Sequence, residues 1–263
     1  TAADVVVELA NQGIDTVRTG LATYTLGANV ENLIATSAAT HRFTGNGLNN
    51  LIIGGAGADS IAGGIGNDTI DGGAGIDRLL GSAGNDLFIA TAGDVVIEAL
   101  NAGHDTVQAT GGTFVLGANI EDLVLTGTAT KGTGNGLANI IIGNSLSNVL
   151  SGGAGNDKLD RGSGIDYLLG GPGQDLMTVG AGNHRFRFTT LADSTVATPD
   201  VILDFNHATE VDRIELNLID ANANLAGNQA FVYRGAAFTG AARDLRVESL
   251  GDNFYLAAGD VTG

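Results

Sequence analysis

The 263-residue sequence contains no cysteine, no tryptophan, one methionine and only two prolines. The absence of cysteine excludes disulfide bonds and a cysteine nucleophile. There is no apolar run long enough for a membrane-spanning helix, and no signal-peptide pattern follows Thr1. A chain without disulfides needs another source of stabilisation.

Basic residues are scarce. The sequence has 12 Lys and Arg against 29 Asp and Glu, a formal net charge of −17. Nucleic-acid phosphates and anionic lipid surfaces attract basic side chains, so we expect neither a nucleic-acid partner nor membrane insertion. Charge repulsion and 42 glycines both oppose a compact state unless cations neutralise the chain.

The most regular feature is a nine-residue repeat. Residues 54–89 read GGAGADSIA, GGIGNDTID, GGAGIDRLL and GSAGNDLFI, and residues 152–178 read GGAGNDKLD, RGSGIDYLL and GGPGQDLMT. Each unit has an apolar residue at its eighth position and an aspartate at its sixth. These aspartates are Asp59, Asp68, Asp77, Asp86, Asp157, Asp166 and Asp175.

This spacing has a chemical reading. Glycine allows a tight turn whose carbonyl oxygens crowd together, and the aspartate adds a charged oxygen, which together suit Ca²⁺. The last three residues predict a short strand with its middle side chain pointing inward. Two units form one coil, so turns on one edge lie eighteen residues apart, which pairs Asp59 with Asp77. The alternative, a solenoid with metal-free turns, does not require aspartate at every sixth position.

Weaker copies flank the two blocks. Asn50, Asn139 and Asn148 occupy the aspartate position in units that begin at Gly45, Gly134 and Gly143. A neutral amide oxygen predicts that these coils continue the fold with weak or absent ions. His184 lies eighteen residues after Asp166 and is expected to mark the end of the series of turns.

A longer repeat relates two spacers. The segment that begins DVVVE at Asp4 returns as DVVIE at Asp94, ninety residues later, and TYTLGANVENLIATSAAT returns as TFVLGANIEDLVLTGTAT. VENLIAT and IEDLVLT alternate as half-buried strands do. VVVELANQG fits either a short helix or a strand and turn. Asp15, Asp105, Glu31 and Glu121 recur with the repeat, and turn or cap roles are favoured for them over additional ligand roles.

From about residue 188 the nine-residue repeat stops. Alternating apolar residues in VILDF, DRIEL, AFVYR, LRVES and FYLAA predict antiparallel strands. The LNLIDANANL stretch could instead form a helix. A solenoid needs its last hydrophobic coil covered, so this segment is expected to be a cap.

These motifs carry a family resemblance that covers nearly the whole chain. The nonapeptides resemble those of the RTX proteins, which bacteria export by type I secretion. D-x-I-x-D-F…D-R-I-E-L…I-D-A, followed by F-T-G-x-A-x-x-L-R, resembles the C-terminal domain of serralysin-type metalloproteases. The spacers resemble those of large RTX calcium-binding proteins. The start at Thr1 and the end at GDVTG lead us to expect a piece of a longer protein, without its secretion signal.

The resemblance implies a set of Ca²⁺ ligands, the aspartates and backbone carbonyl oxygens of paired turns. By position it implies Gly54, Ala56, Asp59, Gly63, Ile65, Asp68, Gly73, Gly75, Asp77, Gly84, Asp86, Gly152, Ala154, Asp157, Asp166, Gly171, Gly173 and Asp175, with Asp204 and Asp212 in the cap. Arg161 departs from the pattern because it replaces the first glycine of its turn, which weakens any site shared with Asp166.

Catalytic motifs are absent from the sequence. It contains neither H-E-x-x-H nor G-x-S-x-G, and its glycine-rich turns lack the Lys-Ser/Thr of a phosphate loop. We therefore expect no catalysis within these residues.

Together these features predict an all-β chain, a right-handed parallel β-roll (β-solenoid) in two repeat blocks with a C-terminal β-rich cap. The expected divisions are residues 1–92, 93–187 and 188–263. The predicted function is that of a calcium-binding RTX module of a secreted or cell-surface protein, which folds on Ca²⁺ binding outside the cell. The expected partners are calcium ions and the type I secretion machinery, with self-association or binding to a surface polysaccharide left open. Two alternatives remain: a structural surface layer, adhesin or filament that self-associates, and the accessory part of a secreted protease, lipase or polysaccharide-modifying enzyme.

Overall fold

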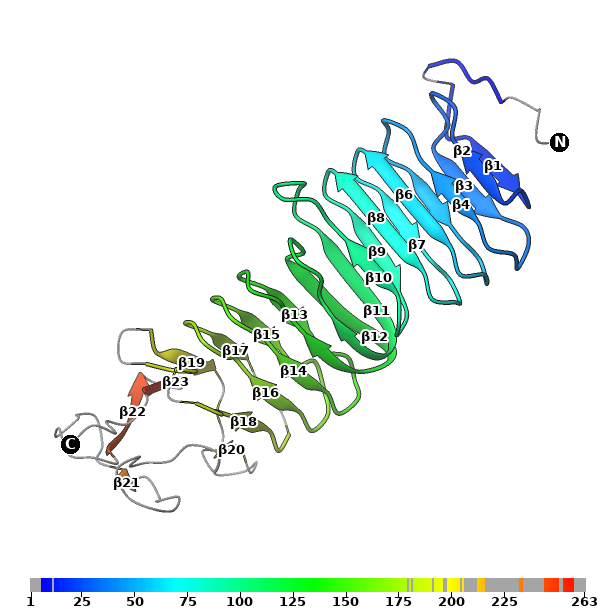
Figure 1. Cartoon of the computed structure of the whole chain (residues 1–263). Coiled ribbons are helices and arrows are strands. Elements are labelled where there is room, and N and C mark those ends of the chain that lie inside the picture. The colour runs from blue at the N-terminus through cyan, green and yellow to red at the C-terminus, as the bar shows by residue number, and fades with distance from the viewer. Residues whose placement is uncertain are drawn as a thin grey trace. The chain divides into compact units, whose positions relative to one another are not determined.

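A computed structural model describes most of the chain. The described residues are 6–10, 12–178, 180, 182–190, 192–195, 198–203, 205 and 212–215, with the backbone of 232–233, 244–250 and 253–257. Every regular element among them is a β-strand (Figure 1). Internal contacts divide the chain into two units, Thr1–Ala129 and Thr130–Gly263. The boundaries expected from the repeats, after residues 92 and 187, stay a prediction.

In the first unit, alternate strands join two parallel sheets. One sheet contains β1 (Thr16–Thr19), β3 (Asn32–Ala35), β5 (Leu51–Ile53), β7 (Thr69–Asp71), β9 (Leu87–Ala90), β11 (Thr106–Val115) and β12 (Asp122–Thr133). The other contains β2 (Thr23–Thr25), β4 (Arg42–Thr44), β6 (Ser60–Ile65), β8 (Arg78–Ala83) and β10 (Val95–Ile97). Each nonapeptide therefore supplies one strand, and each coil supplies one strand to each sheet.

The pairing register follows the eighteen-residue coil. Ile52 pairs with Ile70, and Ile70 pairs with Phe88 in the next coil. On the second sheet, Ile61 pairs with Leu79. All five side chains are buried, so the eighth positions stack into one apolar core between the sheets. Period-two alternation along each strand sends the neighbouring side chains outward.

The second unit repeats this arrangement. Its strands are β13 (Ile140–Ile142), β14 (Val149–Ser151), β15 (Lys158–Asp160), β16 (Tyr167–Leu169), β17 (Leu176–Thr178), β18 (Arg185–Arg187), β19 (Asp200–Leu203) and β20 (Arg213–Glu215), followed by β21 (Val232–Tyr233), β22 (Asp244–Leu250) and β23 (Asn253–Ala257). Odd-numbered strands β13 to β19 pair in parallel, as do even-numbered strands β14 to β20. The prediction of an all-β parallel solenoid is confirmed.

The strands after residue 188 lie close to where alternation predicted them, but not all of them are antiparallel. β21 was expected to be antiparallel and pairs in parallel with β22. β19 and β20 were expected to be antiparallel and instead pair in parallel with β17 and β18. They extend the solenoid because Ile202 and Ile214 stand in register with the inward Met177 and Phe186. β23 is antiparallel to both β19 and β22, as expected. The LNLIDANANL segment lies outside the described residues.

The spacers also add coils. β3 and β12 coincide with VENLIAT and IEDLVLT, and Leu33 and Leu123 are buried, so the prediction of half-buried strands is confirmed. In the second copy, VVIEALNAG forms β10 followed by a turn rather than a helix.

Candidate metal centre

The repeat aspartates form a hydrogen-bonded ladder along the stacked turns. In each case Oδ1 accepts the backbone N–H of the residue at the same position one coil earlier. Asp77 Oδ1 accepts from Asp59 N at 2.7 Å, and Asp86 Oδ1 accepts from Asp68 N at 2.7 Å. The sequence pairs separated by eighteen residues are therefore brought together.

The other carboxylate oxygen has no such partner. Oδ2 is buried without a hydrogen bond in Asp59, Asp68, Asp77, Asp86, Asp157 and Asp175. A buried carboxylate oxygen that has lost its water carries a large desolvation cost unless a positive group faces it. Oxygen ligands of this kind fit Ca²⁺, a hard cation that accepts carboxylates and carbonyls.

The first glycine of each turn leaves room beside that oxygen. A Cβ added to Gly54 would lie 2.5 Å from Asp59 Oδ2 and 2.7 Å from the carbonyl oxygen of Gly72. Gly152 has the same surroundings, Asp157 Oδ2 and the carbonyl oxygen of Gly170. Carboxylate and carbonyl oxygens therefore pack against the glycine Cα more closely than any side chain at that position would allow. The residues present fit a Ca²⁺ ion, with the aspartates as its charged ligands.

The turns reach this geometry through positive backbone angles. The second and fourth positions have φ of 85° at Gly73, 140° at Gly75, 101° at Gly171 and 153° at Gly173. A residue with a Cβ rarely adopts these values, which explains the GGxG pattern. Gly63, Ile65, Gly84, Ala56 and Ala154 lie in the same stacked turns. Their carbonyl ligand roles stay a prediction.

Burial raises the pKa of the seven aspartates of the nonapeptide repeats. Desolvation is the main cause, opposed by the backbone N–H that each group accepts. It raises the pKa of Asp68 to about 7 and that of Asp157 to about 6. For Asp77, at about 6, and Asp175, at about 7, neighbouring carboxylates raise the pKa further. These groups favour a bound cation or a bound proton over an isolated charge.

In the asparagine turns, the side-chain oxygen accepts a hydrogen bond from a backbone N–H of its own turn. Asn50 Oδ1 accepts the N–H of Asn46 at 2.8 Å, within its own turn. Asn139 and Asn148 accept from Asn135 and Asn144 in the same way, at 2.8 and 2.9 Å. Their side-chain oxygens thus have a hydrogen-bond donor, which the aspartate Oδ2 atoms lack. This difference agrees with the weak or absent ions expected at these turns.

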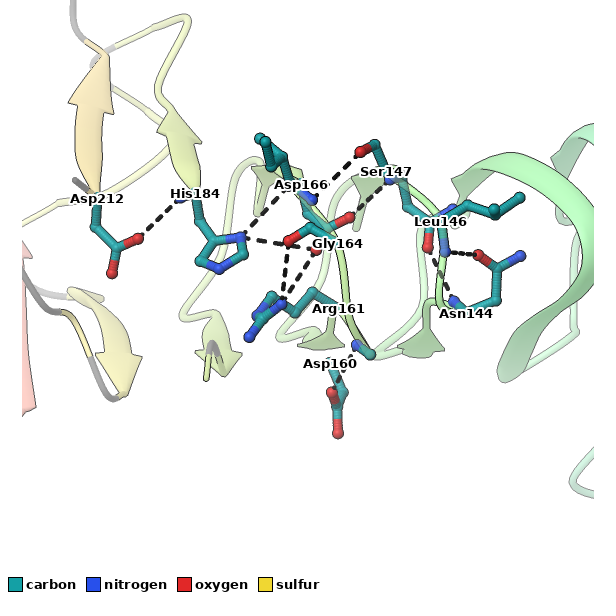
Figure 2. A network of polar contacts seen from close by, with 12 residues as sticks. Asn144, Leu146, Ser147, Asp160, Arg161, Gly164, Asp166, His184 and Asp212 are labelled. Carbon is teal, nitrogen blue, oxygen red and sulfur yellow. Dashed lines mark hydrogen bonds and ion pairs between the residues drawn. The ribbon is translucent and has the colours of Figure 1, made fainter. Parts of the chain in front are cut away.

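The Asp166 turn has its own counter-charge (Figure 2). Arg161 Nη1 lies 3.4 Å from Asp166 Oδ2, with side chains 3% and 0% exposed. His184 Nδ1 lies 3.7 Å from the same oxygen and accepts the Asp166 N–H at 3.3 Å. The guanidinium therefore faces the oxygen that stays without a partner in the other six repeats. A Ca²⁺ role for Asp166 stays a prediction, and this geometry weighs against it.

The ladder does not end at His184, contrary to expectation. His184 N donates to Asp212 Oδ1 at 2.8 Å, one coil further on (Figure 2). The imidazole Nδ1 can accept the N–H that an aspartate Oδ1 accepts elsewhere, so the register is kept. Asp212 is buried in this ladder, whereas Asp204 lies outside the described residues.

The Arg161–Asp166 pair yields a prediction. Arg161→Met removes the guanidinium from Asp166 Oδ2 without restoring the repeat glycine, so it leaves a buried carboxylate without its counter-ion. In saturating Ca²⁺, we expect the free energy of unfolding to fall by about 3 kcal/mol, as for a broken buried pair. Urea unfolding measures this change. Asp166→Asn in the same chain should recover much of the loss, and an Arg161→Met variant as stable as the parent would rule out the counter-ion role.

Sequence reasoning missed three acidic residues of the ladders. Asp200 Oδ1 accepts Asp175 N at 2.9 Å, its Oδ2 is buried without a partner, and burial raises its pKa to about 8. Asp94 Oδ1 accepts Asp77 N at 2.8 Å. Glu98 lies beside Asp86 and was not singled out. Asp200 follows Asp175 by twenty-five residues, so the eighteen-residue rule alone could not find it.

The recurring spacer acids also have defined places. Asp105 Oδ1 accepts Asp86 N at 2.8 Å, and Asp105 N donates to Glu121 Oε2 at 2.8 Å. The first copy repeats the second contact, with Asp15 N donating to Glu31 Oε2 at 2.9 Å. Glu31 and Glu121 thus accept the turn N–H that an aspartate accepts within the blocks.

Comparison with known proteins agrees with this geometry. Residues 44–79 and 80–113 match the family model described as RTX calcium-binding nonapeptide repeat (4 copies). Residues 133–252 match the model described as Peptidase M10 serralysin C terminal. No curated protein matches the chain. None of the described elements is a helix with the length and hydropathy that a membrane crossing requires.

The fold and the ladders define a calcium-binding parallel β-solenoid. The chain carries RTX calcium-binding nonapeptide repeats and a region similar to the serralysin C terminus, and Ca²⁺ is the ion that such repeats bind. Regions of these two kinds are non-catalytic in serralysin-type proteins and are typical of secreted bacterial proteins.

Proposed function

We propose that the chain is a calcium-binding module of a protein exported by type I secretion, and that it folds when it meets Ca²⁺ outside the cell. The observation that carries this proposal is the row of buried Oδ2 atoms without partners. Folding without cations would bury these charges uncompensated, in a chain of net charge −17.

Ligand binding coupled to folding supplies the driving force. An ion that binds only the folded chain stabilises it by about 2.7 kcal/mol when its concentration is a hundred times its dissociation constant. Extracellular Ca²⁺ modules have dissociation constants of about 10⁻⁴ to 10⁻³ M, so cytosolic Ca²⁺ would leave the chain unfolded and fit for export. The module acts without catalysis, in service of the secreted or surface protein to which it belongs.

A conservative substitution tests the ligand role. Asp157→Asn keeps the Oδ1 acceptor for Asn139 N but replaces Oδ2 with an amide nitrogen that repels a cation. We expect a higher Ca²⁺ midpoint for folding, measured by far-UV circular dichroism on calcium-depleted protein. The matched control is Asp160→Asn, three residues away on an exposed side chain outside the ladder. Equal midpoints for the parent and Asp157→Asn would refute the ligand role.

A further inference from the structure

Three buried acids meet where the first nonapeptide block joins the second spacer. Asp86, Glu98 and Asp105 each offer a carboxylate oxygen, and these three atoms lie within 4.8 Å of one another. The residues are 2%, 6% and 0% exposed. Asp86 belongs to the last nonapeptide turn of the first block, whereas Glu98 and Asp105 belong to the spacer, so this group is not formed by two nonapeptides.

Glu98 occupies a position that a backbone carbonyl fills elsewhere. At Gly54 and Gly152, the space that a Cβ would take is bounded by the aspartate Oδ2 and by a carbonyl oxygen from the next coil. At Gly81, the corresponding space is bounded by Asp86 Oδ2 and Glu98 Oε1. A side-chain oxygen from the spacer therefore points into the cradle where a repeat turn would present its main chain.

Unpartnered oxygens point to a ligand at this place. Oδ2 of Asp86 and Oδ2 of Asp105 are both buried without a hydrogen bond. Asp105 Oδ1 continues the ladder by accepting Asp86 N at 2.8 Å. Glu98 is held in position by two backbone donors, Ser82 N on Oε1 and Ala99 N on Oε2, each at 3.2 Å. Backbone N–H groups thus hold these carboxylates in place, while the two buried Oδ2 atoms keep no hydrogen-bond partner.

We propose that Asp86, Glu98 and Asp105 form a further Ca²⁺ site, in which the spacer glutamate replaces a carbonyl ligand of the nonapeptide turn. This inference rests on the proposed function, because it assumes that Ca²⁺ is the ion of the adjoining ladder. The ion joins the last repeat turn to the spacer and extends the row of ions one coil beyond the nonapeptides.

The chemistry of the three groups selects Ca²⁺. Carboxylate and carbonyl oxygens suit hard cations rather than those that prefer thiolate or imidazole. Mg²⁺ retains several waters and needs a small octahedral shell, whereas a buried set of oxygens around a glycine suits the larger Ca²⁺. Burial first, and then the charge of Asp105, raises the pKa of Glu98 to about 7, which reflects the same lack of compensating charge.

The first spacer provides a matched comparison. Glu8 occupies the position of Glu98 ninety residues earlier, and its Oε1 likewise accepts the following backbone N–H, from Leu9 at 3.2 Å. Among the described residues, however, Glu8 is not part of any such group of three acids. The glutamate alone therefore does not make the site; it needs an Asp86 opposite.

The test is the number of Ca²⁺ ions bound per chain, measured by equilibrium dialysis on the full chain. Glu98→Gln is isosteric and keeps the acceptor for Ser82 N, and Asp105→Asn keeps the acceptor for Asp86 N. We expect each variant, and the double variant, to bind one ion fewer than the parent. Glu8→Gln should bind the same number as the parent. Far-UV circular dichroism in saturating Ca²⁺ verifies that every variant is folded.

The outcomes separate this proposal from the proposed function. A parent chain that binds no Ca²⁺ would overturn both. A parent that binds Ca²⁺ while folded Glu98→Gln binds the same number would overturn the further site alone. Loss of two ions in the double variant, one for each substitution, would overturn a single shared site.

Discussion

Calcium-depleted protein is expected to gain β structure as the pH falls from about 8 to about 5. Burial raises the pKa of Asp68 and Asp175 to about 7 and that of Asp200 to about 8. The folded chain therefore holds protons that the unfolded chain, with ordinary aspartate pKa values near 4, has released. Their contribution to stability is fully present below about pH 4 and is lost as the pH rises through 6 to 8.

Far-UV circular dichroism of the depleted protein at several pH values measures this effect. In saturating Ca²⁺ the dependence should reverse, because protons compete with the ion for the same carboxylates. A depleted protein that is equally folded at pH 5 and pH 8 would contradict this expectation. It would mean that ionised buried carboxylates do not destabilise the folded chain.

Gly63→Ala is expected to remove the ion held by Asp68. The added Cβ would clash with Asp68 Oδ2 and displace this ligand oxygen. The backbone at Gly63 does not have the positive φ of its neighbour Gly64, so the cost comes from the filled space rather than from the backbone. Overpacking of this kind typically costs about 1–3 kcal/mol, to which the lost ion adds. We expect one bound Ca²⁺ fewer and a higher Ca²⁺ midpoint for folding.

Gly47→Ala is the matched control. It makes the same chemical change one coil earlier, where an added Cβ would meet nothing within 4 Å. Its Ca²⁺ count and folding midpoint should equal those of the parent. If Gly63→Ala also bound the parent number of ions with the parent midpoint, Asp68 Oδ2 could not be a ligand whose position depends on Gly63.

The nonapeptide period predicted the fold because one periodic signal determines both local structure and register. An apolar eighth position in every unit predicts that Ile61 and Leu79 stack, and they do. The aspartate at the sixth position likewise predicts the partners Asp68 and Asp86. In regular coils, sequence distance translates directly into spatial distance.

The period could not predict contacts made where the coil length changes. Asp200 joins the ladder of Asp175 after twenty-five residues, and Asp105 joins that of Asp86 after nineteen. Glu98 reaches the end of the block through its side chain, at a position that no repeat spacing identifies. These contacts depend on how intervening turns fold, which the sequence pattern does not encode.

A departure from the repeat, Arg161 at a glycine position, also changes the chemistry of its turn. The sequence pattern predicted only part of this change. Arg161 was expected to weaken a site because it replaces a glycine. The structure shows in addition that its guanidinium faces Asp166 Oδ2 at 3.4 Å. Which atom an arginine contacts depends on its rotamer and on the position of the neighbouring turn. The role of Arg161 as a counter-ion therefore could not be predicted from the sequence alone.

The most direct test of the account is a Ca²⁺ titration of the chelator-stripped chain near pH 7.5, followed by far-UV circular dichroism and light scattering. We expect a largely unfolded chain that gains β structure cooperatively at about 10⁻⁴ to 10⁻³ M Ca²⁺. Growth in particle size over the same range would support self-association of the folded module. A stripped chain that already has its full β signal, unchanged by Ca²⁺, would contradict calcium-dependent folding.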